Sequence, residues 1–203
     1  MTRIGVMTAS AVLAASLPAA AQGTTWQIDA AHSQATFQVR HLMVTNVRGD
    51  FGKMSGKIDW DGKSFATVKA DATIDVASVN TREQKRDDHL RSPDFFDAAT
   101  HPSITFKSKR AEVAGPKKFK LVGDLTMRGV TKEVTLDVEA TDIVKDPRGG
   151  LRIGAQATTT INRQDFGVKW NRTLDTGGVV VGDEVKIMID LALVQAAATA
   201  PSE

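Results

Sequence analysis

The 203-residue sequence contains no cysteine. A chain without cysteine forms no disulfide, has no thiol nucleophile and builds no thiolate metal site, so its hydrophobic core must stabilise it alone. Tyrosine is also absent, and aromatic residues make up 5% of the chain. Membrane-spanning β-barrels carry aromatic girdles and an apolar outer band, so these absences argue against that class.

The charge of the chain is nearly balanced. It has 26 Lys and Arg against 24 Asp and Glu, which gives a formal net charge of +2. A surface that binds nucleic acid needs a marked excess of basic residues. The composition therefore predicts a partner other than nucleic acid.

The first residues have the layout of a secretory signal peptide. Arg3 precedes an apolar run from Val6 to Leu17, and small residues end the segment at Ala21. The run is too short for a membrane span, and the Ala-Ala-Ala sequence fits a cleavage site. We therefore expect a signal peptide over 1–21, one exported domain over 22–194 and a disordered tail over 195–203. In a cell with an outer membrane, the protein would be periplasmic.

The rest of the chain is dominated by apolar residues that alternate with polar ones. This period of two is typical of half-buried β-strands, and turn sequences such as Asp61-Gly62 separate the runs. About eight strands joined by short turns favour an antiparallel meander that closes into a barrel or folds into a sandwich. The predicted strands are 33–41, 54–60, 68–76, 104–108, 118–127, 133–140, 151–161 and 185–193.

A short helical insertion interrupts this pattern over residues 81–98. Residues 81–91 favour a helix and lack alternation. Ser92 then has the character of an N-cap, with Pro93 at the first helical position and Asp94 in the first turn. The sequence predicts one or two short helices that bring Leu90, Phe95 and Phe96 to an apolar surface.

Small residues are frequent on the face of the strands that we assign to the interior. Large inward side chains are needed to fill an eight-stranded barrel, so small ones predict an elongated apolar cavity. The alternative is that Phe37, Phe106 and Ile74 fill the space. The small inward residues are Ala35, Ala70, Ala72, Gly123, Ala140, Ala155, Ala157 and Thr159.

Two polar clusters are candidates for chemistry. Arg86, Asp87 and His89 have the residue types of an active site, but they also suit hydrogen bonds that tie a helix to the barrel. The four histidines have no metal-ligand spacing, and neither a nucleophile elbow nor a glycine-rich phosphate loop is present. The second cluster contains Arg163 and Asp165, which could pair with each other or with the helical segment, although an inward Arg163 could also bind an anionic head group.

The ordered motifs of the chain resemble those of the YceI-like family. The resemblance covers about Trp26 to Leu193 and joins motifs that are individually weak. They are Trp26-Gln27-Ile28-Asp29 with His32-Ser33, His41-Leu42-Met43, Gly49-Asp50-Phe51, Ser78-Val79-Asn80-Thr81, Arg86 to Asp97, His101-Pro102, Gly123-Asp124-Leu125-Thr126, Arg128-Gly129-Val130-Thr131 and Asn162 to Gly167.

The resemblance implies an all-β, lipocalin-like, eight-stranded antiparallel barrel that binds a polyisoprenoid, an isoprenoid quinone or a similar lipid. It implies no catalytic residue, no metal and no cofactor, and a homodimer is compatible with it. We expect Arg86, His89 and Arg163 to lie near the mouth of the cavity. The expected apolar lining is Phe37, Val39, Met54, Ile58, Ile74, Leu90, Phe95, Phe96, Phe106, Leu125 and Phe166.

Two other functions are compatible with the sequence. One is an enzyme that uses Asp87, His89 and Arg163 on an isoprenoid or quinone substrate. The other is a stress or accessory protein for a membrane redox partner, with the lipid as shared cargo.

Overall fold

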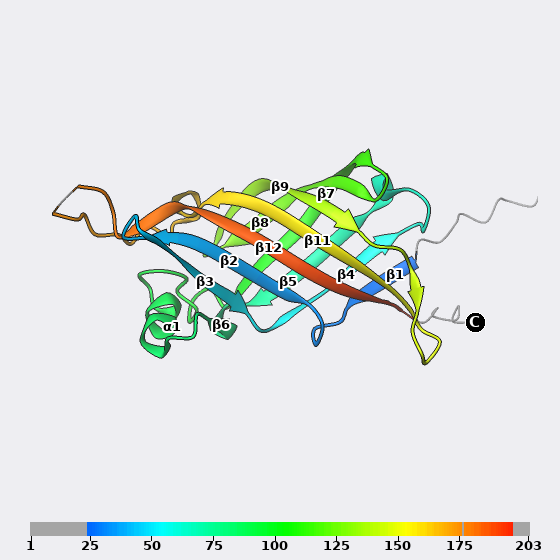
Figure 1. Cartoon of the computed structure of the whole chain (residues 1–203), viewed down its shortest axis with the longest axis horizontal. Helices are drawn as coiled ribbons and strands as arrows, with labels where there is room; N and C mark the ends of the chain where they lie inside the picture. Colours follow the sequence, from blue (N-terminus) through cyan, green and yellow to red (C-terminus); the bar gives the residue numbers. More distant parts are fainter. Residues whose placement is uncertain (1–23, 176, 197–203) are drawn as a thin grey trace, which may run out of the picture.

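The computed structural model describes residues 24–175 and 177–196. Most of them lie in antiparallel strands that form an elongated barrel (Figure 1). The elements are β1 (Thr24–Ile28), β2 (Gln34–His41), β3 (Thr45–Phe51), β4 (Met54–Trp60), η1 (Phe65–Thr67), β5 (Lys69–Asp75), η2 (Val76–Ser78), β6 (Val79–Asn80), α1 (Gln84–Arg91), β7 (Ser103–Gly115), β8 (Lys118–Met127), β9 (Val130–Ala140), β10 (Val144–Lys145), β11 (Leu151–Asn162), η3 (Arg163–Phe166) and β12 (Val181–Gln195).

The barrel closes where the last strand meets the first two. β12 pairs with β11 along one edge and with β1 and β2 along the other. β1 and β2 act as one interrupted strand, because β1 continues the sheet to β4 while β2 continues it to β3. β3 and β4 likewise act as one interrupted strand, and so do β5 and β6, because β3 pairs with β6 and β4 pairs with β5. Eight strands therefore surround the lumen, which confirms the predicted closed antiparallel barrel.

β1 and β3 lie outside the strands that the alternation predicts. β3 contains Gly49, a residue that weakens the sequence signal of a strand. The structure explains this glycine, because a Cβ at Gly49 would lie 2.5 Å from Cζ of Phe37 on the neighbouring strand. The ring of Phe37 occupies the place that a larger residue at position 49 would need.

The helical insertion contains one α-helix, not two. Glu83 caps the N-terminus of α1, since its side chain accepts a hydrogen bond from the Lys85 amide at 3.1 Å. The predicted second helix at Ser92 is wrong: Ser92 ends α1, and residues 93–96 form a turn. The guanidinium of Arg128 explains the difference, because it donates to the carbonyls of Pro93 at 2.7 Å and Phe95 at 3.1 Å and so fixes the segment as a turn.

The buried residues form two clusters, one toward each end of the barrel. One surrounds Trp26, Trp60 and Phe119. The other surrounds Phe51 and Phe166 and contacts the helical insertion. Between these clusters the barrel is hollow, as described below.

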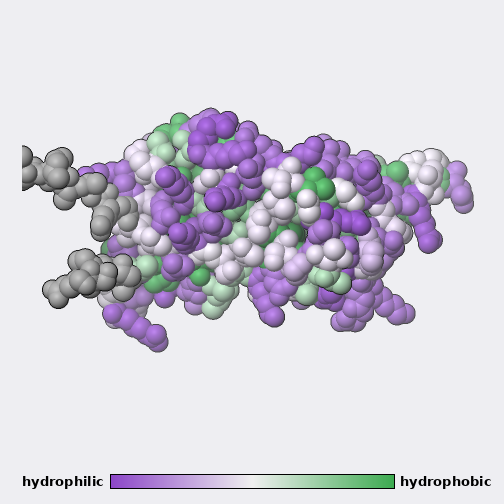
Figure 2. Space-filling view, turned by 180° about the vertical axis from the view of Figure 1, so that it is seen from behind, coloured by the Kyte–Doolittle hydropathy of each residue, from purple (hydrophilic) through white to green (hydrophobic). Residues whose placement is uncertain are grey.

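The outer face of the barrel is largely hydrophilic (Figure 2). Ion pairs run across neighbouring strands, such as Lys120 with Asp137 at 2.6 Å and Lys118 with Glu139 at 3.2 Å. Within the described residues, no helix combines the length and the apolar character needed to cross a membrane.

The predicted signal peptide lies outside the described residues. The predicted tail does so only in part, because β12 extends through Gln195 and the amide of Ala196 donates to the carbonyl of Thr25 at 2.8 Å. The strand therefore continues into the first residue that we assigned to the tail.

Candidate functional site

The barrel encloses an apolar cavity of about 390 Å³. Its wall includes nearly all the small inward residues that predicted it, among them Ala70, Ala72 and Ala157. Gly123 is the exception, because the ring of Phe106 lies where its Cβ would be, 2.7 Å away. The large side chains thus narrow the lumen without filling it.

All but one of the predicted lining residues lie on the cavity wall. They come from opposite sides of the barrel and from the helical insertion. Phe166 does not line the cavity: it is 2% exposed and packs in the cluster around Phe51 and Val76. The predicted residues on the wall are Phe37, Val39, Met54, Ile58, Ile74, Arg86, His89, Leu90, Phe95, Phe96, Phe106, Leu125 and Arg163.

One end of the cavity is sealed by aromatic rings. Phe65 stacks between Trp60 and Phe119, with ring centroids 5.0 Å apart in each pair. Trp26 packs beside Trp60 at 6.5 Å and is 2% exposed. Trp26 and Trp60 therefore contribute to the seal at this end of the barrel.

The other end of the cavity opens beside α1. Its wall there includes exposed Arg40 and half-buried His41, Arg86 and His89, whereas the aromatic residues at the far end are mostly buried. We therefore place the mouth at the α1 end.

Three rings border this mouth. The imidazole of His89 meets Phe95 at 4.9 Å and Trp170 at 5.1 Å, both edge to face. The ring centroids of Phe95 and Trp170 lie 5.3 Å apart, so the three rings form a triangle. Nε2 of His89 lies 2.9 Å from Oδ2 of Asp94, which orients the imidazole. This aromatic triangle joins the helical insertion to the segment before β12.

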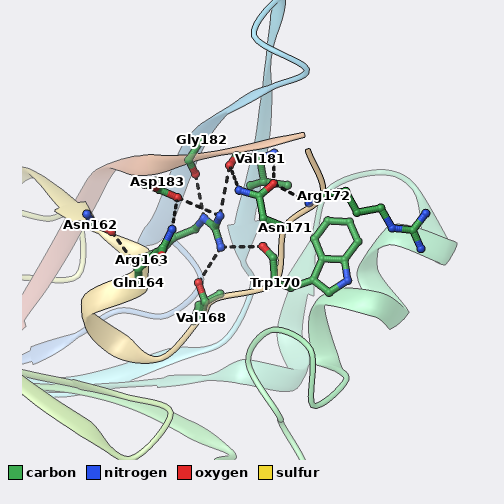
Figure 3. A network of polar contacts seen from close by, with 10 residues as sticks. All are labelled: Asn162, Arg163, Gln164, Val168, Trp170, Asn171, Arg172, Val181, Gly182 and Asp183. Atoms are coloured by element: carbon green, nitrogen blue, oxygen red, sulfur yellow. Dashed lines mark hydrogen bonds and ion pairs between the residues drawn. The ribbon is translucent and has the colours of Figure 1, made fainter. Parts of the chain in front are cut away.

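Arg163 is a structural residue at the edge of the mouth (Figure 3). Its guanidinium donates to the carbonyls of Val168 at 2.6 Å, Trp170 at 2.9 Å, Gly182 at 2.9 Å and Val181 at 3.2 Å. It also pairs with the carboxylate of Asp183 at 3.1 Å, and not with Asp165 as the sequence suggested.

The five N–H donors of an arginine are thus engaged within the protein. Burial lowers the pKa of the Arg163 guanidinium, and the charge of Asp183 opposes that shift. Arg163 shapes the mouth by holding the chain on both sides of the loop, and it has no donor left for a head group.

Arg86 lies on the cavity wall and is anchored by Thr81. Its Nε donates to the hydroxyl of Thr81 at 2.7 Å, and its NH2 group donates to the Thr81 carbonyl at 2.8 Å. The hydroxyl and amide of Thr81 in turn donate to buried Asp87. Within the described residues Arg86 forms no ion pair, and its NH1 group makes no hydrogen bond.

The candidate catalytic residues do not converge. Asp87 accepts hydrogen bonds from Thr81, whereas His89 pairs with Asp94. Residues two apart on a helix do not share a face. Among residues 24–175 and 177–196, no group of three or more His, Asp or Glu is placed to hold a metal ion.

Comparison with known proteins places the chain in a family. Residues 26–193 match the YceI-like domain. The chain belongs to the YceI-like family. UPF0312 protein SA2479 of Staphylococcus aureus is 42% identical over 164 residues, which are 80% of this chain and 93% of that protein.

Solved structures share the barrel of this YceI-like protein. BcnA of Burkholderia cenocepacia matches with a TM-score of 0.72 and 29% identity, over 81% of this chain and 98% of that one. The YCEI protein of Campylobacter jejuni matches with a TM-score of 0.66 and 36% identity, over 78% and 90%. A polyisoprenoid binding domain from Saccharophagus degradans has the same fold, with a TM-score of 0.63 and 21% identity over 85% and 99%.

Sequence reasoning did not identify several wall residues of this YceI-like barrel. Phe65 lies in the 3-10 turn after β4, where strand alternation gives no signal. Arg40 follows inward-facing Val39 in β2, so the alternation predicts an outward side chain. Because Arg40 lies next to the turn, it nevertheless reaches the mouth. Only the three-dimensional position of the turn could reveal such a residue.

Proposed function

We propose that this YceI-like protein is an exported carrier that holds a long apolar lipid in its barrel lumen. The observation that carries the proposal is the apolar cavity of about 390 Å³, with aromatic rings at one end and a polar mouth at the other. A polyisoprenoid or an isoprenoid quinone fits this description, with the chain in the lumen and the polar group near Arg86. The polyisoprenoid binding domain of Saccharophagus degradans supports this ligand class through its shared fold.

The energetics favour a long chain over a small molecule. Burial of apolar surface contributes about 25 cal/mol per Å², or about 0.8 kcal/mol per methylene group. Association and chain ordering oppose this gain by several kcal/mol. A short ligand would gain too little from burial, whereas each further isoprene unit that enters the lumen adds to the affinity.

Export is the second part of the proposal. It rests on the signal-like segment from Met1 to Ala21, and it predicts a periplasmic carrier in a cell with an outer membrane. Fractionation of the native host with an antibody against the protein tests this part. Intact Met1 at the N-terminus of the main cellular form would contradict it.

The carrier proposal is tested by the contents of the cavity. Protein purified from its native host without detergent should release about one lipid per chain when it is extracted with organic solvent, and mass spectrometry should identify that lipid. The matched control is Ala157→Phe, which narrows the lumen. Native protein that carries no more lipid than this variant would contradict the proposal.

A further inference from the structure

The turn between β2 and β3 carries three consecutive apolar residues on the surface. Leu42, Met43 and Val44 are 39%, 52% and 73% exposed. The turn lies at the mouth, since Arg40 and His41 directly before it belong to the cavity wall. Elsewhere in the described part of the chain, the exposed large apolar residues occur singly or as the pair Ile143–Val144.

The backbone of this turn makes its apolar residues more unusual. The amide of Val44 donates to the carbonyl of His41 at 3.1 Å, and the two central residues have positive φ, 52° at Leu42 and 61° at Met43. Turns with two such residues favour Asn and Gly, and the left-handed conformation costs other residues about 1–2 kcal/mol each. Asn-Gly would form the hairpin better, so the demands of the fold do not explain Leu42 and Met43.

A second loop lies beside the turn at the same end of the barrel. The amide of Leu42 donates to the carbonyl of Val180 at 2.8 Å, which joins the turn to the segment before β12. In Figure 1 both segments project at the end near α1, and Figure 2 shows hydrophobic and hydrophilic residues mixed on this end, at its right. The guanidinium of Arg172 lies 5.8 Å from the ring centre of Trp170 in this loop.

The charge around the turn is positive. Residues 40–48 contain Arg40 and Arg48 and no acidic residue, and residues 169–175 contain Lys169 and Arg172 against Asp175. Among the described residues, none of these four basic side chains forms an ion pair with a carboxylate, and all four are exposed.

The opposite end of the barrel differs. There Lys117 pairs with Asp142 at 2.6 Å and Arg152 pairs with Asp29 at 2.8 Å, whereas exposed Lys145 and Arg148 form no ion pair among the described residues. The mouth therefore differs from that end in its run of three exposed apolar residues, Leu42 to Val44, against the pair Ile143–Val144.

We infer that the mouth docks on a lipid bilayer through the tip surface, which consists of Leu42, Met43 and Val44 with the flanking cations Arg40, Arg48, Lys169 and Arg172. Apolar side chains would enter the bilayer interface, where their burial is favourable. Anionic head groups would attract the basic residues, at about 1 kcal/mol for each Lys or Arg near the surface. This arrangement deepens the proposed function and rests on it: the lipid chain would pass from the bilayer into the cavity without crossing water.

The test is flotation of the purified protein with vesicles of phosphatidylcholine and phosphatidylglycerol in equal parts. The tip variant is Val44→Glu, because Val44 does not line the cavity. The matched control is Val144→Glu at the sealed end, where the native residue is 56% exposed. We expect Val44→Glu to lower the bound fraction at least fivefold and Val144→Glu to leave it unchanged, and added salt should weaken binding of the native protein.

The second readout is the lipid content of each variant, measured by solvent extraction after loading from detergent. If Val44→Glu loses vesicle binding but loads as the native protein does, docking and carriage are both supported. If the native protein binds vesicles but never retains lipid, the docking surface stands and the carrier function fails. Equal vesicle binding by native protein and Val44→Glu, or equal loss in both variants, would overturn the docking surface.

Discussion

The imidazole of His89 meets the indole of Trp170 edge to face, with ring centroids 5.1 Å apart. His89 belongs to α1, and Trp170 belongs to the loop that leads to β12. Each ring also contacts Phe95. The contact therefore joins two distant segments of the chain across the mouth of the cavity.

Trp170→Ala should speed the release of a bound lipid. Loss of the edge-to-face contact with His89 and the tilted contact with Phe95 removes about 1 kcal/mol or more from the packing at the mouth, and 1.4 kcal/mol corresponds to about a tenfold change in rate. Stopped-flow measurement with a fluorescent isoprenoid analogue checks this. Trp170→Phe, which keeps an aromatic ring, should release the analogue at nearly the native rate; equal rates for Trp170→Ala and the native protein would contradict a gating role.

Arg163→Met should destabilise the fold strongly. The methionine fills similar space but leaves the carbonyls of Val168, Trp170 and Gly182 without their side-chain donor, while the Val181 carbonyl still accepts from Asn171. A buried polar group that loses its partner costs about 1–3 kcal/mol, so the loss of these contacts should lower the free energy of unfolding by about 3 kcal/mol or more. Urea denaturation measures it.

The control for this variant is Asp183→Asn, which removes the carboxylate charge but keeps an oxygen acceptor. It should cost much less than Arg163→Met, because the four carbonyl contacts remain. A smaller loss for Arg163→Met than for Asp183→Asn would show that the ion pair, and not the carbonyl contacts, supports the loop.

Ala157→Phe should lower lipid affinity without unfolding the barrel. Ala157 is 4% exposed and lies on the cavity wall in β11. The added ring occupies lumen that a lipid chain would fill, and each excluded methylene costs the complex about 0.8 kcal/mol. We expect at least a tenfold loss of affinity in titrations with an isoprenoid ligand. Thr160→Phe, outward on the same strand, is the matched control and should bind as the native protein does.

The stability that the sealed end contributes should depend on pH. Hydrogen bonds from the Arg152 guanidinium hold the pKa of the Asp29 and Asp146 carboxyls below their ordinary value. Groups with lowered folded-state pKa stabilise the protein above the unfolded pKa of about 4, and this contribution is lost as the pH falls through the folded pKa. Arg152→Met should therefore lower the melting temperature at pH 7 by more than at pH 3.

The control for this experiment is Lys118→Met, which removes a more exposed ion pair with Glu139. Its effect on the melting temperature should be small at both pH values. If the difference in melting temperature between Arg152→Met and the native protein stayed constant from pH 7 to pH 3, the proposed role of Asp29 and Asp146 would be contradicted.

The strand pattern could be predicted because alternation depends only on which side of the sheet each residue faces. That rule gave the eight-stranded barrel and, through the small inward residues, the cavity. It failed at β3, where Gly49 is required by the ring of Phe37 from another strand. Local sequence cannot show a steric demand made by a residue on a different strand.

The polar residues were harder to assign for a related reason. Ser92 and Pro93 have the local character of a helix start, but Arg128 takes the carbonyls of that segment. Arg163 has the character of a ligand-binding cation, yet carbonyls from the chain after η3 take its donors. In both cases an arginine decides the outcome by donating to backbone carbonyls, which carry no residue-specific signal.

The stack of Trp60, Phe65 and Phe119 gives the cavity a blind end. A lipid chain that entered from the mouth would advance only as far as these rings, so the depth of the cavity would limit the length of chain that the barrel can bury. Each methylene group beyond that length would stay in water and would not contribute its burial free energy of about 0.8 kcal/mol to binding. The rings would thus set a preferred chain length, and a smaller residue at position 65 would shift that preference toward longer lipids.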